Sequence, residues 1–359
     1  MKNNFKYLIL FAFLFGVQSV VTSQELSEVK AKFKNYQSKP NKKASKNIYI
    51  NSFNVLVEVY REDVDYKAKR EFRGKGRAEA LARAALGLKG VDTSLLQQKT
   101  DLLFAEFIQS LESKGFAIID ASQASNTDYY KNAKSFKGPM VRESANPGLL
   151  EVLPAGFSGF TSKANAAGKS SKKEGLMPGL KGLGKLVKNT NMLSKELDDA
   201  IVIDVNLTLS WSESGGSWLA GLGSADAKIK TNLALGEKAV SAPNENGKSK
   251  GKEDYYILPN DFSVAQGSGL RKVDCKGYLK NPIYINGVIS NTVVQSNNKG
   301  NASKTYDIGD LYRVTEWTSS ISENAKFIEV DPNKFSDALY LSGKAFINAQ
   351  LDYFFDLYK

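Results

Sequence analysis

The sequence lacks histidine altogether, because none of its 359 residues is His. Histidine is the side chain that most readily gains and loses a proton near neutral pH. Its absence therefore excludes Ser-His-Asp triads, Cys-His pairs and histidine zinc sites. The sequence also has no Walker phosphate loop and no EF-hand spacing. We predict no catalytic, cofactor-binding or metal-binding residue, and we interpret the protein as non-enzymatic.

An enzyme that works with carboxylate, Lys, Ser or Tyr side chains is the remaining catalytic alternative. Its candidate acids are Asp198, Asp199 and Asp204. Asp204 falls on the polar face of a predicted strand, and aspartate side chains are mostly exposed in proteins. We therefore expect its carboxylate to be solvated.

Cysteine is nearly absent too, since Cys275 is the only one. A single cysteine can form no internal disulfide, and free cysteines are usually buried. We expect Cys275 to lie buried between strands; an intermolecular disulfide or a reactive thiol is the alternative. No cysteine lies near the N-terminus, so a bacterial lipid anchor is not predicted.

Long apolar runs are limited to the N-terminus. Tyr7–Val17 is continuously apolar, Lys2 and Lys6 precede it, and small residues lead up to Gln24. This pattern predicts a cleavable signal peptide over residues 1–23 and an exported protein that is periplasmic, outer-membrane associated or secreted. An uncleaved anchor is the alternative, although the run is shorter than the ~20 residues of a spanning helix.

The charge is strongly positive, with 49 basic and 38 acidic residues. Without Lys2 and Lys6, the mature chain would keep 47 − 38 = +9. Such a charge favours acidic partners, and export makes nucleic acid the least favoured of them. We expect the partners to be other envelope proteins or an anionic surface of lipid or polysaccharide, and a homo-oligomer is a further alternative.

The pattern of hydrophobic and polar residues divides the chain into segments. We predict a basic flexible leader over 24–46 and an α/β core over 47–236 that contains an insertion at 121–197. A polar linker follows over 237–256. The last segment, 257–359, is predicted to form short strands and a C-terminal helix that packs on the core.

Two helices and one long hairpin are the clearest predicted elements. One helix is expected over 94–114, with Ser94 as its cap and Asp92 and Thr93 as rival caps. Another is expected after Asp331-Pro332. Residues 200–236 alternate between apolar and polar and predict a long amphipathic β-hairpin. The predicted class is α+β, with a mixed, antiparallel-rich sheet, two principal helices and long basic insertions.

Other segments carry weaker signals. Residues 61–91 are expected to form a mobile loop or lid, with a short helix around Ala78–Leu86, and Ile283–Ile289 is expected to form a tight hairpin. Residues 121–197 are expected to break the regular pattern and form a long functional or disordered segment.

Two groups of residues are candidates for contact with a membrane or a partner. Lys181, Lys185 and Lys188 recur at helical spacing in an apolar segment, which suits a membrane surface, although a solvated loop is the simpler interpretation. Trp211 and Trp218 lie near the tip of the predicted hairpin, where they would suit a membrane interface. These residues underlie the alternative of a membrane-active or pore-forming protein that uses the 200–236 hairpin.

The order of predicted elements resembles a known bacterial fold. A strand over Ile48–Val59, a helix over Leu95–Leu111 ending in LESKGFAIID, and the strand DAIVIDVNLTLSW with its hairpin resemble the periplasmic α/β fold of the curli-secretion channel lipoprotein family (CsgG-like) and its relatives in the TolB N-terminal domain. The resemblance covers residues 47–236. It implies a non-enzymatic cell-envelope protein that assembles with partners, and it assigns no role to any single residue. Family members are typically lipid-anchored, a feature for which this chain lacks the cysteine.

Overall fold

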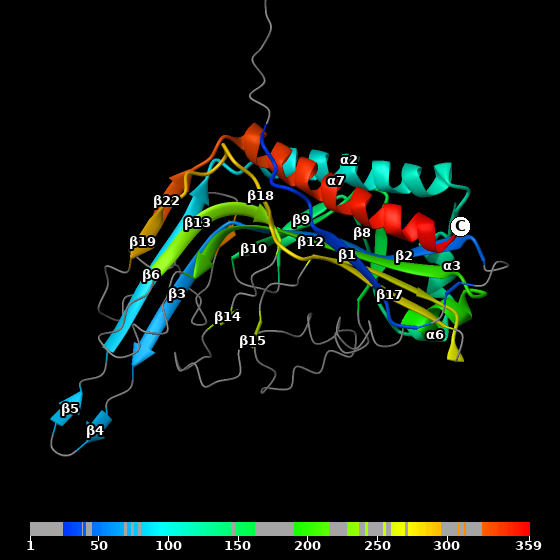
Figure 1. Cartoon of the computed structure of the whole chain (residues 1–359), viewed down its shortest axis with the longest axis horizontal. Coiled ribbons are helices and arrows are strands. Elements are labelled where there is room, and N and C mark those ends of the chain that lie inside the picture. Colours follow the sequence, from blue (N-terminus) through cyan, green and yellow to red (C-terminus); the bar gives the residue numbers. More distant parts are fainter. Residues whose placement is uncertain are drawn as a thin grey trace, which may run out of the picture.

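The structure is a computed structural model of the whole chain. The residues that it describes are 24–37, 39–40, 45–67, 70–72, 75–77, 80–144, 148–161, 190–214, 228–236, 241–242, 254–255, 260–269, 272–295, 307–308, 312–313 and 325–359. The fold is α+β, as predicted, with one large mixed sheet and two long helices (Figure 1).

The large sheet forms the body of the molecule. Its main path runs β1 (Ala31–Asn35), β17 (Val273–Leu279), β16 (Asp261–Gln266), β12 (Ile201–Ser214), β2 (Asn47–Glu58), β10 (Leu149–Leu153) and β9 (Met140–Glu143). β2 pairs in parallel with β12 and with the short β7 (Ala117–Ile118). The other neighbours along this path are antiparallel.

The predicted hairpin is formed by β12 and β13 (Lys228–Leu235), which pair antiparallel over their described residues. The other edge of β13 pairs with β18 (Ile283–Tyr284) and β19 (Val293–Gln295). The expected tight hairpin over Ile283–Ile289 is therefore wrong. Its first residues pair with β13, although Gly287 does have the positive φ of a turn.

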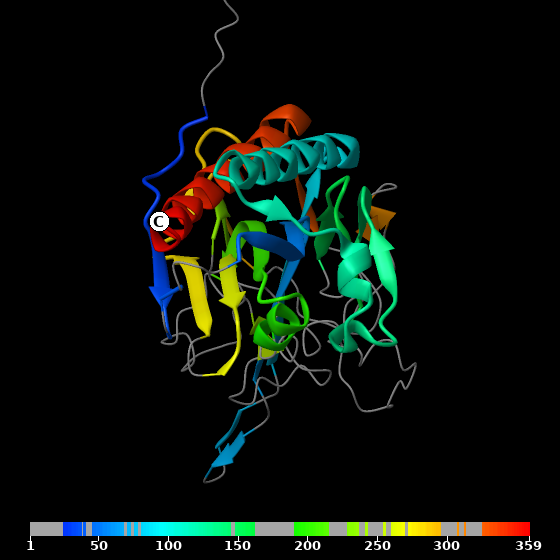
Figure 2. The same cartoon turned by 90° about the vertical axis from the view of Figure 1, so that its right-hand side faces the viewer.

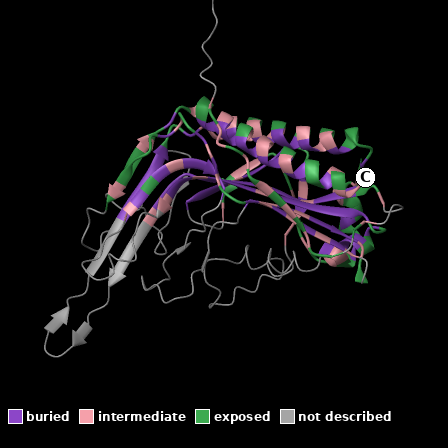
Figure 3. Ribbon diagram, viewed as in Figure 1, coloured by how far each residue is buried: buried purple, intermediate pink, exposed green. Residues whose placement is uncertain are grey.

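The helices α2 (Thr93–Ser113) and α7 (Pro332–Leu357) lie side by side on one face of the sheet (Figures 1 and 2). Figure 3 shows that their buried residues face the sheet. Aromatic rings fill the layer between them: Phe53 of β2 packs on Phe104 and Phe107 of α2, and Phe262 of β16 packs on Phe354 of α7. This apolar layer is the main core of the protein.

Local signals explain where the long helices begin and end. The Asp92 side chain accepts hydrogen bonds from the Ser94 and Leu95 amides at 2.8 and 3.2 Å, so Asp92 is the cap of α2 and Ser94 is not. Gly115, just after α2, has a φ of 83°, which glycine adopts without strain. Asp331 caps α7 in the same way.

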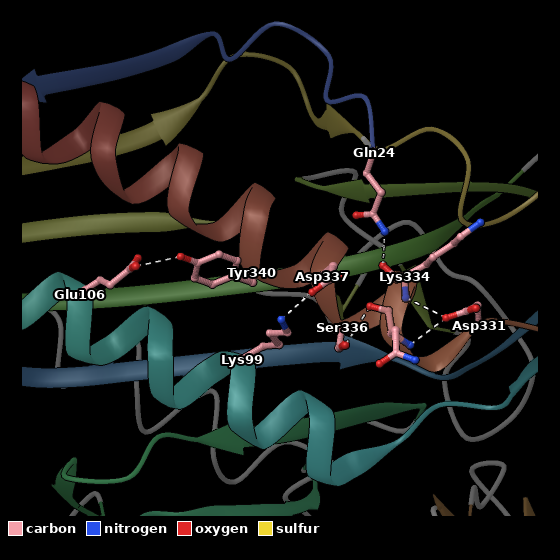
Figure 4. A network of polar contacts seen from close by, with 9 residues as sticks. Gln24, Lys99, Glu106, Asp331, Lys334, Ser336, Asp337 and Tyr340 are labelled. Atoms are coloured by element: carbon pink, nitrogen blue, oxygen red, sulfur yellow. Dashed lines mark hydrogen bonds and ion pairs between the residues drawn. The ribbon is translucent and has the colours of Figure 1, made fainter. Parts of the chain in front are cut away.

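Polar contacts also join the outer faces of the two helices (Figure 4). Lys99 of α2 is paired with Asp337 of α7 at 2.6 Å. Toward the C-terminal ends of both helices, the Tyr340 hydroxyl of α7 donates to Glu106 of α2 at 2.8 Å, and Lys344 of α7 is paired with the same carboxylate. Because the contacts advance together along both helices, α2 and α7 run in the same direction.

The opposite face of the sheet is covered at one end by short helices. These are α3 (Ala121–Ser125), the 3-10 helix η1 (Asp128–Tyr130) and α6 (Thr190–Glu196). They form a second, smaller apolar cluster with Tyr49 of β2 and Val202 of β12. The two faces of β2 and β12 are thus both buried at this end.

A hairpin arm extends away from the body at the other end (Figures 1 and 2). It consists of β3 (Tyr60–Lys67), β4 (Arg70–Phe72), β5 (Lys75–Arg77) and β6 (Ala80–Lys89), and β6 also pairs in parallel with β22 (Lys326–Glu329). The predictions of a loop or lid over 61–91 and of a helix around Ala78–Leu86 are therefore wrong. Cross-strand pairing overrode the helix propensity of the alanines.

Two further segments contain more structure than predicted. The leader at 24–46 includes β1, an edge strand whose Phe33 stacks on Tyr353 of α7, so the prediction of a flexible segment is wrong for Ala31–Asn35. The insertion at 121–197 supplies two strands of the large sheet, β9 and β10, and a small sheet of β8 (Ser135–Lys137) and β11 (Ser158–Phe160). β1 adds to the large sheet beside β17, and β10 adds to it beside β2.

Short strand pairs complete the described elements. β14 (Ser241–Ala242) pairs with β15 (Asp254–Tyr255), and β20 (Asp307–Ile308) pairs with β21 (Tyr312–Arg313). Cys275 of β17 is buried between β16 and β1, which confirms the expectation for it.

Candidate functional site

Of the five residues predicted to contact a membrane or a partner, the structure describes one. Trp211 is fully buried, so the prediction of a surface contact is wrong for it. It belongs to the apolar stripe of β12, and that stripe joins the main core. Lys181, Lys185, Lys188 and Trp218 lie outside the described residues.

A β-bulge in β2 creates the most distinctive polar site of the fold. Ile50 is paired with Ile203, but the next pair is Ser52 with Asp204, so Asn51 is an extra residue. Bulges redirect side chains and often lie next to functional sites. Here both Asn51 Nδ2 and Ser52 Oγ donate to Asp204 Oδ1, at 2.6 and 2.8 Å.

The bulge also connects the sheet to η1. The hydroxyl of Tyr130, the last residue of η1, donates to Asn51 Oδ1. The Tyr130 ring stacks on Phe160 at a centroid distance of 4.3 Å and meets Tyr129 edge-on. Tyr130, Asn51, Ser52 and Asp204 therefore form one hydrogen-bonded chain, which we call the Asp204 network.

Burial changes the acidity of this network. Asp204 is only 4% exposed, and this burial raises its pKa to about 6, against the lowering effect of the hydrogen bonds from Ser52 and Asn51. Burial also raises the pKa of the Tyr130 hydroxyl well above its ordinary value. The expectation of a solvated carboxylate at Asp204 is thus wrong, because the polar face of this strand is covered.

A second polar row lies beside the first and crosses three strands. Asn54 Nδ2 of β2 donates to Asn206 Oδ1 of β12 at 3.0 Å, and Asn206 Nδ2 donates to Asp261 Oδ1 of β16 at 2.9 Å. Ser263 Oγ donates to the other oxygen of Asp261 at 2.8 Å. Burial raises the pKa of Asp261, while the nearby Lys276 lowers it.

Glu58 occupies a similar position at a second bulge. The pairing of β12 with β13 shifts between Ser210 and Ser212. There the Glu58 carboxylate accepts hydrogen bonds from the Trp211 and Ser212 amides, at 2.8 and 3.0 Å, and from the Ser212 hydroxyl. Burial raises the pKa of Glu58, and the positive charge of Arg61 opposes that rise. The carboxylate thus serves as the acceptor for two strand amides, those of Trp211 and Ser212, at the point where the regular pairing with β13 is interrupted.

These carboxylates have a common arrangement. Asp204, Asp261 and Glu58 each accept hydrogen bonds from groups of the protein itself, so they connect strands to one another. Within the described part of the chain, no group of three or more His, Cys, Asp or Glu residues is placed to hold a metal ion. The geometry supports internal polar bridges more directly than acid–base chemistry.

Comparison with protein-family models, curated proteins and solved structures finds no match. Among the described helices, none combines the length and the hydropathy that crossing a bilayer requires.

The hairpin arm is the second candidate site, as an interaction surface. Over Ala80–Ala85, β6 pairs with β3 and with no other described strand. β22 pairs with β6 on one edge and with no described strand on the other, and its Phe327 is 40% exposed. A two-stranded hairpin is marginally stable alone in water. The arm is therefore a region where a partner would add stability.

Part of the Asp204 network could have been found in the sequence. The apolar residues of β2 alternate through Ile48 and Ile50 and then resume at Phe53 and Val55. This shift by one position marks an extra residue between them, as a bulge requires. The sequence carries no comparable signal for Tyr130, which reaches the network from 79 residues away.

Proposed function

We propose that this protein is a non-enzymatic, exported component of the bacterial cell envelope with a binding or assembly role. The observation that carries the proposal is the hairpin arm, whose outer half has no described neighbour besides its own two strands. Strand edges that lack a partner are templates for pairing with another chain. A protein that acts through such an arm needs no catalytic residue.

Two further observations support this role. The buried carboxylates are hydrogen-bonded within the fold, as bridges between strands rather than as free acids. The described elements also follow the order β2, α2, β7, β12 and β13, on which the resemblance to the CsgG-like and TolB N-terminal folds rests. That resemblance implies assembly with other envelope proteins.

The test is to follow the assembly state of the processed chain with and without the arm. We would replace residues 62–85 by a short Asn-Gly turn and express both forms with the native N-terminus. We expect the intact protein in the envelope fraction, in a complex larger than the monomer by native mass measurement. The arm-deleted form should keep its fold, shown by its circular dichroism, and should migrate as a monomer.

Other outcomes would favour the other functions. A processed protein that stays monomeric with the arm intact would contradict an assembly role. Leakage of liposome contents caused by the purified protein would favour a membrane-active function of the 200–236 hairpin. The burial of Trp211, Ile229 and Leu233 argues against insertion of the described parts of that hairpin, because these residues belong to the main core.

A further inference from the structure

Positive charge is concentrated at the far end of the hairpin arm. Lys67 ends β3, Arg70 begins β4, and Lys75 and Arg77 begin and end β5. The one acidic residue on β4 and β5 is Glu71, so these five positions sum to 4 − 1 = +3. The figure shows β4 and β5 beyond the ends of β3 and β6, away from the helices (Figure 1).

The rest of the arm does not share this charge. Between the tip and the body, β3 carries three acids, Glu62, Asp63 and Asp65, and the bases Arg61 of β3 and Arg83 and Lys89 of β6 balance them. The arm is therefore neutral near its base and basic at its tip. The excess of positive charge is thus confined to the end of the arm that lies away from the body (Figure 1).

The strand register at the tip is unfavourable without a counter-charge. Arg70 is directly opposite Arg77, and Phe72 is opposite Lys75. Like charges directly opposite each other across an antiparallel pair destabilise that pair. An anionic surface against the tip would remove this repulsion, so the pairing itself is an argument for an acidic partner.

We propose that the arm tip, β4 and β5, contacts the surface of an anionic lipid bilayer. Lys and Arg residues near such a surface are attracted to its acidic head groups. Phe72 adds an aromatic residue, of the kind that settles at the boundary between head groups and acyl chains. The choice of lipid over other polyanions rests on the proposed envelope function, since a two-stranded ribbon also fits the major groove of DNA.

The test compares vesicle binding by three forms of the protein, each beginning at Gln24. The first is the unchanged sequence, and the second carries K67Q, R70Q, K75Q and R77Q. The third is a control with the same change in net charge, made with four substitutions at exposed lysines elsewhere: K32Q, K34Q, K134Q and K326Q. Each is sedimented with vesicles of phosphatidylcholine alone or mixed with phosphatidylglycerol, and matching thermal unfolding curves establish that all three are folded.

We expect the unchanged protein to bind the phosphatidylglycerol vesicles and not the neutral ones, and to be released by salt. Each cation removed from the tip should weaken binding by about fivefold, so the tip variant, which lacks four, should bind about 600-fold more weakly. The control should stay within about threefold, because its lysines lie away from the tip.

Three results would overturn the proposal. They are equal losses in the two variants, unchanged binding by the tip variant, or binding to a DNA duplex with none to the phosphatidylglycerol vesicles. The assembly state is measured without lipid, so failure of the proposed envelope complex and failure of lipid binding are separate results.

Discussion

Replacing Asp204 by Asn is expected to stabilise the protein at neutral pH, which is unusual for a buried polar residue. The Asn side chain keeps an oxygen that can accept the hydrogen bonds from Asn51 and Ser52. It removes a negative charge that is buried among polar groups, with Asp261 as a further acid nearby. The network would thus keep these hydrogen bonds and lose its electrostatic cost.

The size and sign of the effect follow from the pKa. The folded value of about 6 exceeds the ordinary 3.8 by about 2 units, and each unit corresponds to about 1.4 kcal/mol, which gives about 3 kcal/mol as an upper bound. Because the folded pKa is raised, the folded state holds the proton more tightly. Stability of the native sequence should therefore fall as the pH rises from about 4 to about 6, and stay level with respect to this group above that.

Urea unfolding followed by tryptophan fluorescence, at several pH values between about 4 and 8, measures this difference directly. Asp204→Asn should gain most at neutral pH and match the native sequence near pH 4. Glu28→Gln, which alters a carboxylate whose side chain is 76% exposed, is the control and should change little. A variant that is less stable at every pH, or a difference that does not vary with pH, would refute this account of the Asp204 network.

Three further predictions concern the rest of the fold. Glu58→Ala should cost about 3 kcal/mol of unfolding free energy, because it leaves two buried amides without an acceptor, whereas Glu58→Gln should cost less; denaturant titration compares them, and equal losses would contradict the role of the carboxylate. Gly277→Ala should cost about 1 kcal/mol in the same titration, because its Cβ would displace the far end of the Gln350 side chain, and Gln350→Ala should recover part of the loss in the double variant. Mass spectrometry of the exported protein should find an N-terminus at Gln24; a chain that keeps residues 1–23 in the cytosol would contradict export.

The elements that the sequence predicts well are those specified by local signals. The helix after Asp331 has a cap, a proline in its first turn and a continuous apolar stripe, and each of these acts within a few residues. The alternation in β12 similarly fixes which of its faces joins the core. The fold class follows from the same local signals, whereas the burial of Cys275 was expected because free cysteines are usually buried.

The segments that were predicted wrongly are strands whose stability comes from pairing and not from local sequence signals. The leader and the insertion at 121–197 form strands by pairing with segments distant in the sequence, β1 with β17 and β10 with β2. The 61–91 segment pairs with itself, as the hairpin of β3 and β6. A strand gains its stability from the neighbour that it pairs with, so an irregular composition does not exclude it when an edge is available. The prediction of a tight hairpin at Ile283–Ile289 was wrong for a related reason. Its first residues, Ile283 and Tyr284, pair with β13 and not with the residues that follow them.

The sequence alone rules out any chemistry of histidine, because no fold can supply a side chain that the chain lacks. It also determined the long helices and the phase of the central strands, because these depend on spacing between near neighbours. Folding, by contrast, buries Asp204 and Glu58, brings Tyr130 to the Asp204 network, and places Arg70 and Arg77 opposite each other on a projecting arm. Those properties depend on which distant segments cover or pair with a residue, and contact of that kind exists only after the chain has folded.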